Sequence, residues 1–149
     1  MQSPLNDLGA CVREALLSDA QRIAALLLQL GYEVPLAHVE ACLQDRDPDR
    51  EFLVAVVPRA GVVGCVTVSE RRALLAVRRA EIESLVVEDE YRGNRIGALL
   101  VQAAEAWARR RGCATVRLLS NVVRERAHRF YGRLGYDVLK TEHVFQKHL

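Results

Sequence analysis

Residues 81–111 constrain the fold more than any other part of the chain, because they predict a strand, a tight turn and a long helix in direct succession. Residues 81–87 are β-branched and apolar at their end, as expected of a short strand. Beyond the turn, apolar residues recur with the spacing of one helix face, namely Ile96, Leu99, Leu100, Ala103 and Trp107. The next apolar run, residues 115–119, is therefore expected to return as a strand parallel to the first.

The remaining segments add strands and helices around this unit. The other predicted strands are residues 10–17, 51–57, 62–68, 136–139 and 142–147. The other predicted helices have their apolar faces in residues 23–30, 36–43 and 127–134. Turn residues between the second and third of these strands predict an antiparallel hairpin, the last two strands predict another, and the charged residues 69–80 either extend the first hairpin or form a loop. This order predicts an α/β or α+β fold, with a mixed, mostly antiparallel sheet and helices on both of its faces.

Size and charge limit the classes of protein that fit. With 149 residues, of which 50% are hydrophobic, the chain is expected to form a single domain over residues 1–149. Its 21 Lys and Arg residues against 19 Asp and Glu residues leave a net charge of +2, which does not favour nucleic-acid binding. No apolar run is long enough to span a membrane and the first ten residues lack the features of a signal peptide, so a cytoplasmic protein is expected. The histidines and cysteines lack the spacing of a metal site.

The turn between the strand and the long helix has the chemistry of a phosphate-binding loop. A helix begins with unpaired backbone N–H groups and a partial positive charge, and Gly93 and Gly97 let a polyanion approach that backbone closely. Arg92 and Arg95 add positive charge at the same place. The two most familiar nucleotide loops are absent, because the sequence has neither Gly-x-x-x-x-Gly-Lys-Ser/Thr nor Gly-x-Gly-x-x-Gly here.

Two motifs resemble those of the GNAT family of N-acetyltransferases. The turn is similar to the family's pyrophosphate loop, Arg/Gln-x-x-Gly-x-Gly/Ala, with Arg92 and Gly97 in register and Arg95 at the middle glycine. The segment from Ala127 to Tyr136 is similar to the family's Ala-x-x-Phe-Tyr-x-x-x-Gly-Phe/Tyr. The resemblance implies a GNAT-like acyl-CoA N-acyltransferase fold. The sequence leaves two alternatives for Arg95. Either the bulk of its side chain weakens coenzyme A binding, or its guanidinium helps to hold phosphate.

The resemblance also implies where acetyl-CoA, the acetyl donor, binds. In the family the pantetheine arm pairs with the strand before the loop, and a backbone N–H there, in this chain that of Val87, polarises the acetyl carbonyl. Asn121 occupies a position that contacts the coenzyme in family members. The residues implied in coenzyme binding are Leu85, Val86, Val87, Arg92, Gly93, Asn94, Arg95, Ile96, Gly97, Ala98 and Asn121.

Glu83 and Tyr131 are the candidate catalytic residues. Glu83 lies in the strand expected to hold the thioester, and strand alternation places it on the face of Glu81, Leu85 and Val87 unless a bulge intervenes. There it is expected to act as the general base that removes a proton from the acceptor amine; the alternative is an ion pair with a neighbouring arginine. Tyr131 matches the family tyrosine that donates a proton to the leaving thiolate, and the alternative for it is a core aromatic.

The sequence therefore predicts an acetyl-CoA-dependent N-acetyltransferase that acts on a primary amine by direct attack in a ternary complex. A small-molecule amine and a peptide amine are both open as the acceptor, and a homodimer is consistent with the family. Two competing classes remain. One is a catalytically weak or inactive coenzyme A-binding regulatory module, motivated by Arg95. The other is a nucleic-acid-binding protein that uses its arginine-rich helices, which salt-dependent association would reveal.

Overall fold

A computed structural model describes residues 8–74 and 77–149 and divides the chain into two compact units, Met1–Leu118 and Leu119–Leu149. Each unit is described by itself. The first contains a five-stranded sheet in the order β1-β2-β3-β4-β5 and three α-helices. The strands are β1 (Cys11–Glu14), β2 (Arg50–Val57), β3 (Gly61–Arg71), β4 (Arg79–Val87) and β5 (Thr115–Leu118). The helices are α1 (Ala20–Gln29), α2 (Leu36–Gln44) and α3 (Ile96–Arg110), with short 3-10 turns at Leu17–Asp19 and at η2 (Asp89–Tyr91).

The sheet is mixed, as the sequence predicts. Strands β1 to β4 are antiparallel to their neighbours, whereas β5 lies parallel to β4 after the crossover through α3. The hairpin of β2 and β3 is confirmed. The charged residues 69–80 were predicted either to extend the hairpin or to form a loop, and they do both. Strand β3 extends to Arg71, β4 begins at Arg79, and a connection lies between them. Residues 75–76 of that connection lie outside the described residues.

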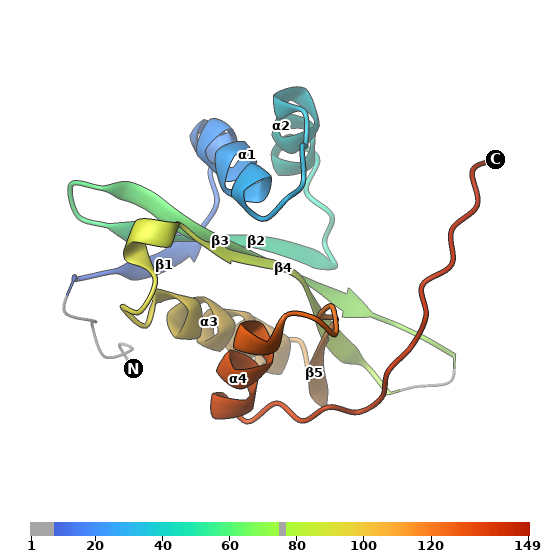
Figure 1. Ribbon diagram of the computed structural model, residues 1–149. Coiled ribbons are helices and arrows are strands. Elements are labelled where there is room, and N and C mark those ends of the chain that lie inside the picture. Colours follow the sequence, from blue (N-terminus) through green and yellow to red (C-terminus); the bar gives the residue numbers. More distant parts are fainter. Residues whose placement is uncertain (1–7, 75–76) are drawn as a thin grey trace. The chain divides into compact units, whose positions relative to one another are not determined.

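Helices cover both faces of the sheet. Helices α1 and α2 lie on one face, where Ile23, Leu26 and Leu43 pack with Val54 and Val86 of the strands. Helix α3 lies on the opposite face (Figure 1). None of the helices in the described part of the chain combines the length and the apolarity needed to cross a membrane.

The buried face of α3 is broader than the single stripe that the sequence predicts. Leu99 and Ala103 are only half-buried, and the buried residues are Ile96, Leu100, Val101, Ala104, Trp107 and Ala108. The helix lies close to the sheet because Gly64 of β3 has no side chain. A Cβ atom on Gly64 would lie 3.1 Å from Leu100 Cδ1 and 3.0 Å from the carbonyl oxygen of Val86. This close approach positions the start of α3, and with it the glycine-bearing turn.

A buried carboxylate ties the end of α3 to the end of β3. The Glu70 side chain is fully covered and accepts hydrogen bonds from Arg78 (2.7 Å), Arg111 (2.8 Å) and Arg72 (3.0 Å). Arg111 also pairs with Asp49 at 2.7 Å. The Arg78 guanidinium first, and then those of Arg111 and Arg72, lower the pKa of Glu70 to about 2 from an ordinary 4.5.

This lowered pKa predicts a pH dependence of stability. A carboxyl group with a lowered pKa in the folded state stabilises that state fully above its ordinary pKa, and the contribution is lost as pH falls from 4.5 toward about 2. Glu70→Gln should therefore lower the free energy of unfolding at neutral pH. Its deficit relative to the unsubstituted protein should shrink as the pH falls through this window, because protonation removes the same charge. Denaturant unfolding at a series of pH values measures this, with Glu40→Gln on the exposed face of α2 as control. A deficit that does not change with pH would contradict it.

The second unit contains α4 (Glu125–Arg133), which ends before Gly135 as predicted. The predicted last hairpin is wrong: residues 136–149, all of them described, form no strand. Their apolar side chains are exposed, with Val144 and Phe145 at 90% and 91%. Alternation of apolar and polar residues favours a strand only where a neighbouring strand supplies hydrogen bonds, and no described residue pairs with this segment in that way.

Candidate active site

Strand β4 has an open edge at its C-terminal end. Strand β5 pairs with Arg79–Ile82 and stops there, so no described strand pairs with residues 83–87 on that side. On the other side, the N–H of Glu88 donates to the carbonyl of Val63 at 2.8 Å. Because backbone groups alternate in direction along a strand, Leu85 and Val87 direct their N–H and C=O groups to the open edge, whereas Val86 directs its own to β3. The structure thus brings Leu85 and Val87 to one accessible edge, whereas Val86, the third strand residue predicted to bind the coenzyme, turns its backbone groups to β3.

A β-bulge lies where the open edge begins. In the pairing of β3 with β4 the register shifts, so that Thr67 faces Ser84, Val68 faces Ile82, and Glu83 has no residue opposite it. An extra residue of this kind changes the alternation of side chains along a strand. The bulge is therefore the feature that decides which face of the sheet Glu83 occupies.

The predicted shared face holds toward Glu81 and fails toward Leu85 and Val87, because the bulge, the exception named in the prediction, lies at Glu83. Its carboxylate lies on the α1 and α2 side, where it accepts a hydrogen bond from Ser69 Oγ at 2.7 Å. Val87 lies opposite Gly64, which approaches Leu100 of α3 on the other face. Glu83 thus shares a face with Glu81, the partner of Ser69, but not with Val87.

The Glu83 carboxylate also forms ion pairs. Arg50 Nε lies 3.2 Å from Oε2, and Arg71 Nη2 lies 3.5 Å from Oε1. The side chain is 23% exposed, although the residue as a whole is exposed because of its backbone at the open edge. The arginine pairing that was the alternative for Glu83 is thus present, and its catalytic role stays a prediction. Sequence reasoning missed Ser69 and Arg50, because nothing in the chain marks them as its partners.

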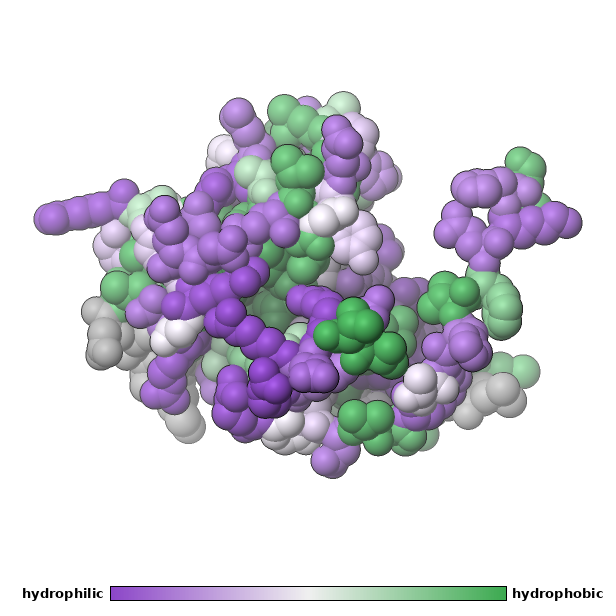
Figure 2. Space-filling view, in the orientation of Figure 1, coloured by the Kyte–Doolittle hydropathy of each residue, from purple (hydrophilic) through white to green (hydrophobic). Residues whose placement is uncertain are grey.

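A cavity of about 340 Å³ adjoins Glu83. It lies between helices α1 and α2 and strands β2, β3 and β4, so it is formed within the first unit. Most of its lining is apolar, with Leu27, Val39 and Phe52 among the contributors, and Glu83 and Ser84 line it at the bulge. Figure 2 shows apolar side chains between the polar ones over α1 and α2 and at the level of the sheet below them.

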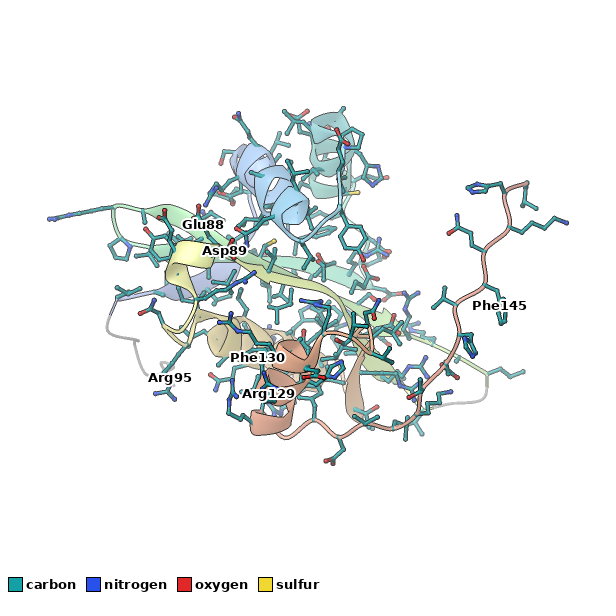
Figure 3. All side chains as sticks on the ribbon, in the orientation of Figure 1. Glu88, Asp89, Arg95, Arg129, Phe130 and Phe145 are labelled. Atoms are coloured by element: carbon teal, nitrogen blue, oxygen red, sulfur yellow. The ribbon has the colours of Figure 1, made fainter. Side chains whose placement is uncertain are left out.

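Helix α1 fastens the end of β4 beside this cavity. Gln29 Nε2 donates to the carbonyl of Val87 at 2.9 Å, and Gln29 Oε1 accepts from the N–H of Asp89 at 3.3 Å. Arg22 donates to the carbonyl of Val62 at 2.8 Å and pairs with Glu88. Figure 3 labels Glu88 just after the end of β4. These residues were not found from the sequence, because their partners lie 40 to 66 residues away along the chain.

The glycine-bearing turn has the backbone geometry of an anion site. Gly93 and Arg95 have φ angles of 81° and 62°, and Ile96 begins α3. Figure 3 labels Arg95 in this turn. Among the described residues, none accepts a hydrogen bond from the N–H groups of Arg95, Ile96, Gly97 or Ala98. These groups therefore stay available for an anion at the positive end of the helix.

The side chains of the turn differ in how they are engaged. Arg92 pairs with Asp89 at 2.9 Å, and Asn94 Nδ2 donates to the carbonyls of Tyr91 and Arg92 at 3.2 and 3.3 Å. Arg95 is exposed and adopts the left-handed conformation that glycine adopts most easily. The turn therefore keeps the shape that a glycine would give it, and it does so at a conformational cost of about 1 kcal/mol.

The second unit holds the other two predicted site residues. Tyr131 lies on α4 with its ring centroid 5.1 Å from that of Phe130 and 6.0 Å from that of Tyr136, and burial raises its pKa above the ordinary value of 10.0. Asn121 Oδ1 accepts from the N–H of Val123 at 3.1 Å, and its carbonyl accepts from His128 Nε2 at 2.9 Å. Within the described residues, no group of three or more His, Cys, Asp or Glu side chains is arranged to hold a metal ion.

The first unit thus combines three chemical elements in one place. An open strand edge presents the N–H of Val87, the start of α3 presents free N–H groups, and a carboxylate faces an apolar cavity. Such an edge can pair with an extended amide-containing chain, whose polyanionic end the helix N-terminus can hold. The carboxylate can accept a proton from a group in the cavity.

The sequence and the fold both resemble known acetyltransferases. The model of the Acetyltransferase (GNAT) family matches residues 17–136. An uncharacterised N-acetyltransferase of Chlorobaculum tepidum is 32% identical over 146 residues, covering 92% of this chain and 81% of that protein. An aminoalkylphosphonate N-acetyltransferase of Salmonella typhimurium is 46% identical over 56 residues, which are 38% of this chain and 36% of that protein. The crystal structure of an aminoglycoside 6'-N-acetyltransferase from Acinetobacter baumannii matches with a TM-score of 0.83 at 21% identity, covering 95% of this chain and 99% of that one, a likeness of fold.

Proposed function

The chain belongs to the acetyltransferase (GNAT) family, and from this premise we propose that it transfers the acetyl group of acetyl-CoA to a primary amine by direct attack in a ternary complex. The observation that carries the proposal is the open edge of β4, which lies between the carboxylate of Glu83 and the unpaired N–H groups at the start of α3. Acetyl transfer needs N–H groups that bind the acetyl donor and a carboxylate that accepts the proton of the amine, and it needs both at the same strand.

The strand edge and the turn suit acetyl-CoA. The N–H groups of Arg95 to Ala98 would hold the pyrophosphate, with the positive end of α3 behind them. Leu85 would pair with a pantetheine amide through its outward backbone groups. The N–H of Val87, whose carbonyl accepts from Gln29, would polarise the acetyl carbonyl. The bound coenzyme supplies an activated thioester.

Two side chains would move the protons of the transfer. The amine nitrogen forms a bond to the acetyl carbon while the bond from that carbon to sulfur breaks, so the nitrogen must lose a proton and the thiolate must gain one. Glu83 would accept the proton from the amine, directly or through water. Tyr131 would donate one to the thiolate, which its raised pKa permits because the phenol stays protonated at neutral pH.

The proposal treats residues 1–149 as a single N-acetyltransferase domain. The family match supports it, because residues 17–136 include parts of both compact units. A homodimer stays a prediction, and sedimentation of the purified protein measures it.

Thermal unfolding with and without acetyl-CoA, followed by amine-dependent thiol release, tests the function. A ligand at about 100 times its dissociation constant should stabilise the protein by about 2.7 kcal/mol, which raises Tm by several degrees. Arg95→Gly serves as the comparison. The variant should be more stable by up to about 1 kcal/mol, because the left-handed conformation suits glycine. A loss of acetyl-CoA affinity in this variant would show that the guanidinium holds phosphate, and a gain would show that its bulk obstructs the loop.

The outcomes separate the competing classes. A shift with acetyl-CoA together with thiol release that depends on an added amine supports the enzyme. A shift without thiol release from any amine supports a coenzyme-binding module, which the glycine-to-arginine difference at residue 95 favours. The absence of both a Tm shift and thiol release at millimolar acetyl-CoA would overturn the proposal.

A further inference from the structure

The cavity beside Glu83 has a lining that selects among classes of amine. Two-thirds of the side chains around it are apolar or thiol groups, contributed by both helices and by the strands. An apolar wall of this kind favours apolar groups by about 25 cal/mol per Å² of surface removed from water. Four of the polar residues of the lining are on the strands, namely Arg50, Thr67, Glu83 and Ser84, and the fifth, His38, is on α2. Ser84 Oγ donates to Thr67 Oγ1 at 3.1 Å.

The charges of the lining oppose a second charged group on the acceptor. Glu83 is the only carboxylate among the residues that line the cavity in the described part of the chain, and Arg50 is the only guanidinium. These two side chains pair with each other at 3.2 Å, so their charges compensate. A polyamine or an aminoglycoside would bring a second ammonium group to a wall without a counter-charge. A phosphonate would find there only the paired Arg50 and the imidazole of His38.

We propose that the acceptor is a small monoamine with an apolar alkyl or arylalkyl body, bound in this cavity with its amine nitrogen at Glu83. The inference rests on the proposed acetyl transfer and names its substrate class. A volume of about 340 Å³ accommodates about ten non-hydrogen atoms at the density of a liquid. Hexylamine and phenethylamine fall within this limit. The products are the N-acetylated amine and free coenzyme A, with the amine proton passed to Glu83.

A pair of isosteric amines tests the proposal directly. Hexylamine and 1,5-diaminopentane have the same chain length, and they differ in whether the far end is a methyl or an ammonium group. The expected kcat/KM for hexylamine, measured by thiol release, is at least about tenfold higher, because the apolar wall accepts the methyl group and opposes the charge. Kanamycin, 2-aminoethylphosphonate and a peptide with a free N-terminus complete the panel.

The outcomes distinguish this inference from the proposed function. An equal or higher kcat/KM for the diamine, for kanamycin, for the phosphonate or for the peptide would overturn the substrate class while leaving acetyl transfer in place. If acetyl-CoA stabilises the protein but none of the amines causes thiol release, both the proposed function and this inference are wrong.

A substitution that fills the cavity gives an independent test. Cys42 lines the cavity from α2, whereas its neighbour Ala41 is exposed on the outer side of the helix. Cys42→Phe should raise KM for hexylamine by about tenfold or more, with acetyl-CoA affinity unchanged, because the ring occupies the space of the alkyl chain. Ala41→Phe should leave KM unchanged. Val34→Phe, at a half-buried position of the same lining, replaces Cys42→Phe if that variant does not fold. An unchanged KM in the folded lining variant contradicts the proposal.

Discussion

Replacement of Tyr131 by phenylalanine is expected to lower kcat by about 10²- to 10⁴-fold, the usual contribution of a positioned general acid, while acetyl-CoA affinity stays the same. The substitution removes only the hydroxyl group, so the packing against Phe130 and Tyr136 is kept. Without the phenol, the thiolate must leave without a proton donor. Steady-state thiol release at saturating acetyl-CoA and amine measures kcat, and the thermal shift with acetyl-CoA measures binding.

A second tyrosine provides the matched control for this experiment. Tyr136→Phe deletes a hydroxyl group from the same aromatic cluster and should leave kcat within about twofold. Because burial raises the pKa of Tyr131 above its ordinary value of 10.0, its phenol should stay mostly protonated at pH values below 10.0. Tyr131 should therefore contribute no loss of activity as pH rises from neutral toward that value. Full activity in Tyr131→Phe would remove this residue as the acid and leave the donor to be sought elsewhere.

Replacement of Leu100 by alanine should have the largest effect on stability, a loss of about 2 to 5 kcal/mol in the free energy of unfolding. Leu100 is fully buried, and its Cδ1 is the nearest side-chain atom to the space above Gly64. The sheet cannot close the resulting gap, because the strand backbone beneath it is held by pairing on both sides. Urea unfolding followed by circular dichroism measures the loss.

The control for Leu100 is a leucine that is exposed. Leu28 lies on α1 with 60% of its surface accessible, so Leu28→Ala should change the free energy of unfolding by no more than about 0.5 kcal/mol. Similar losses in the two variants would contradict the view that α3 is held by close packing over Gly64. Since α3 begins at the glycine-bearing turn, Leu100→Ala should also weaken acetyl-CoA binding in the fraction that stays folded.

Local sequence patterns were sufficient for most elements of the fold. The strand, turn and helix of residues 81–111, the hairpin of β2 and β3, the parallel return of β5 and the helix α4 all follow from apolar spacing and turn chemistry within about 30 residues. The same local character explains the prediction of unpaired N–H groups at the start of α3, because a helix N-terminus leaves them unpaired wherever it occurs. The prediction extended from Arg92 to Ala98, and it is wrong for the N–H of Arg92, which donates to the carbonyl of Asp89 at 3.2 Å.

The failures have a common physical origin. The hairpin predicted in residues 136–149 required a neighbouring strand, which alternation along one segment cannot provide. The face of Glu83 required the register of β3 against β4, where one extra residue at the bulge changes the alternation of every side chain before it relative to those after it.

By itself the sequence determined the class of the protein: the order of strands and helices, the phosphate-binding turn and the two motifs of the acetyltransferase family. Only the tertiary structure decided what surrounds Glu83, namely Ser69, Arg50 and an apolar cavity. It also decided that Gln29 donates a hydrogen bond to the carbonyl of Val87 at the end of β4. The reason is that backbone conformation follows from neighbours in sequence, whereas the environment of a side chain is set by segments that meet across strand register and helix packing.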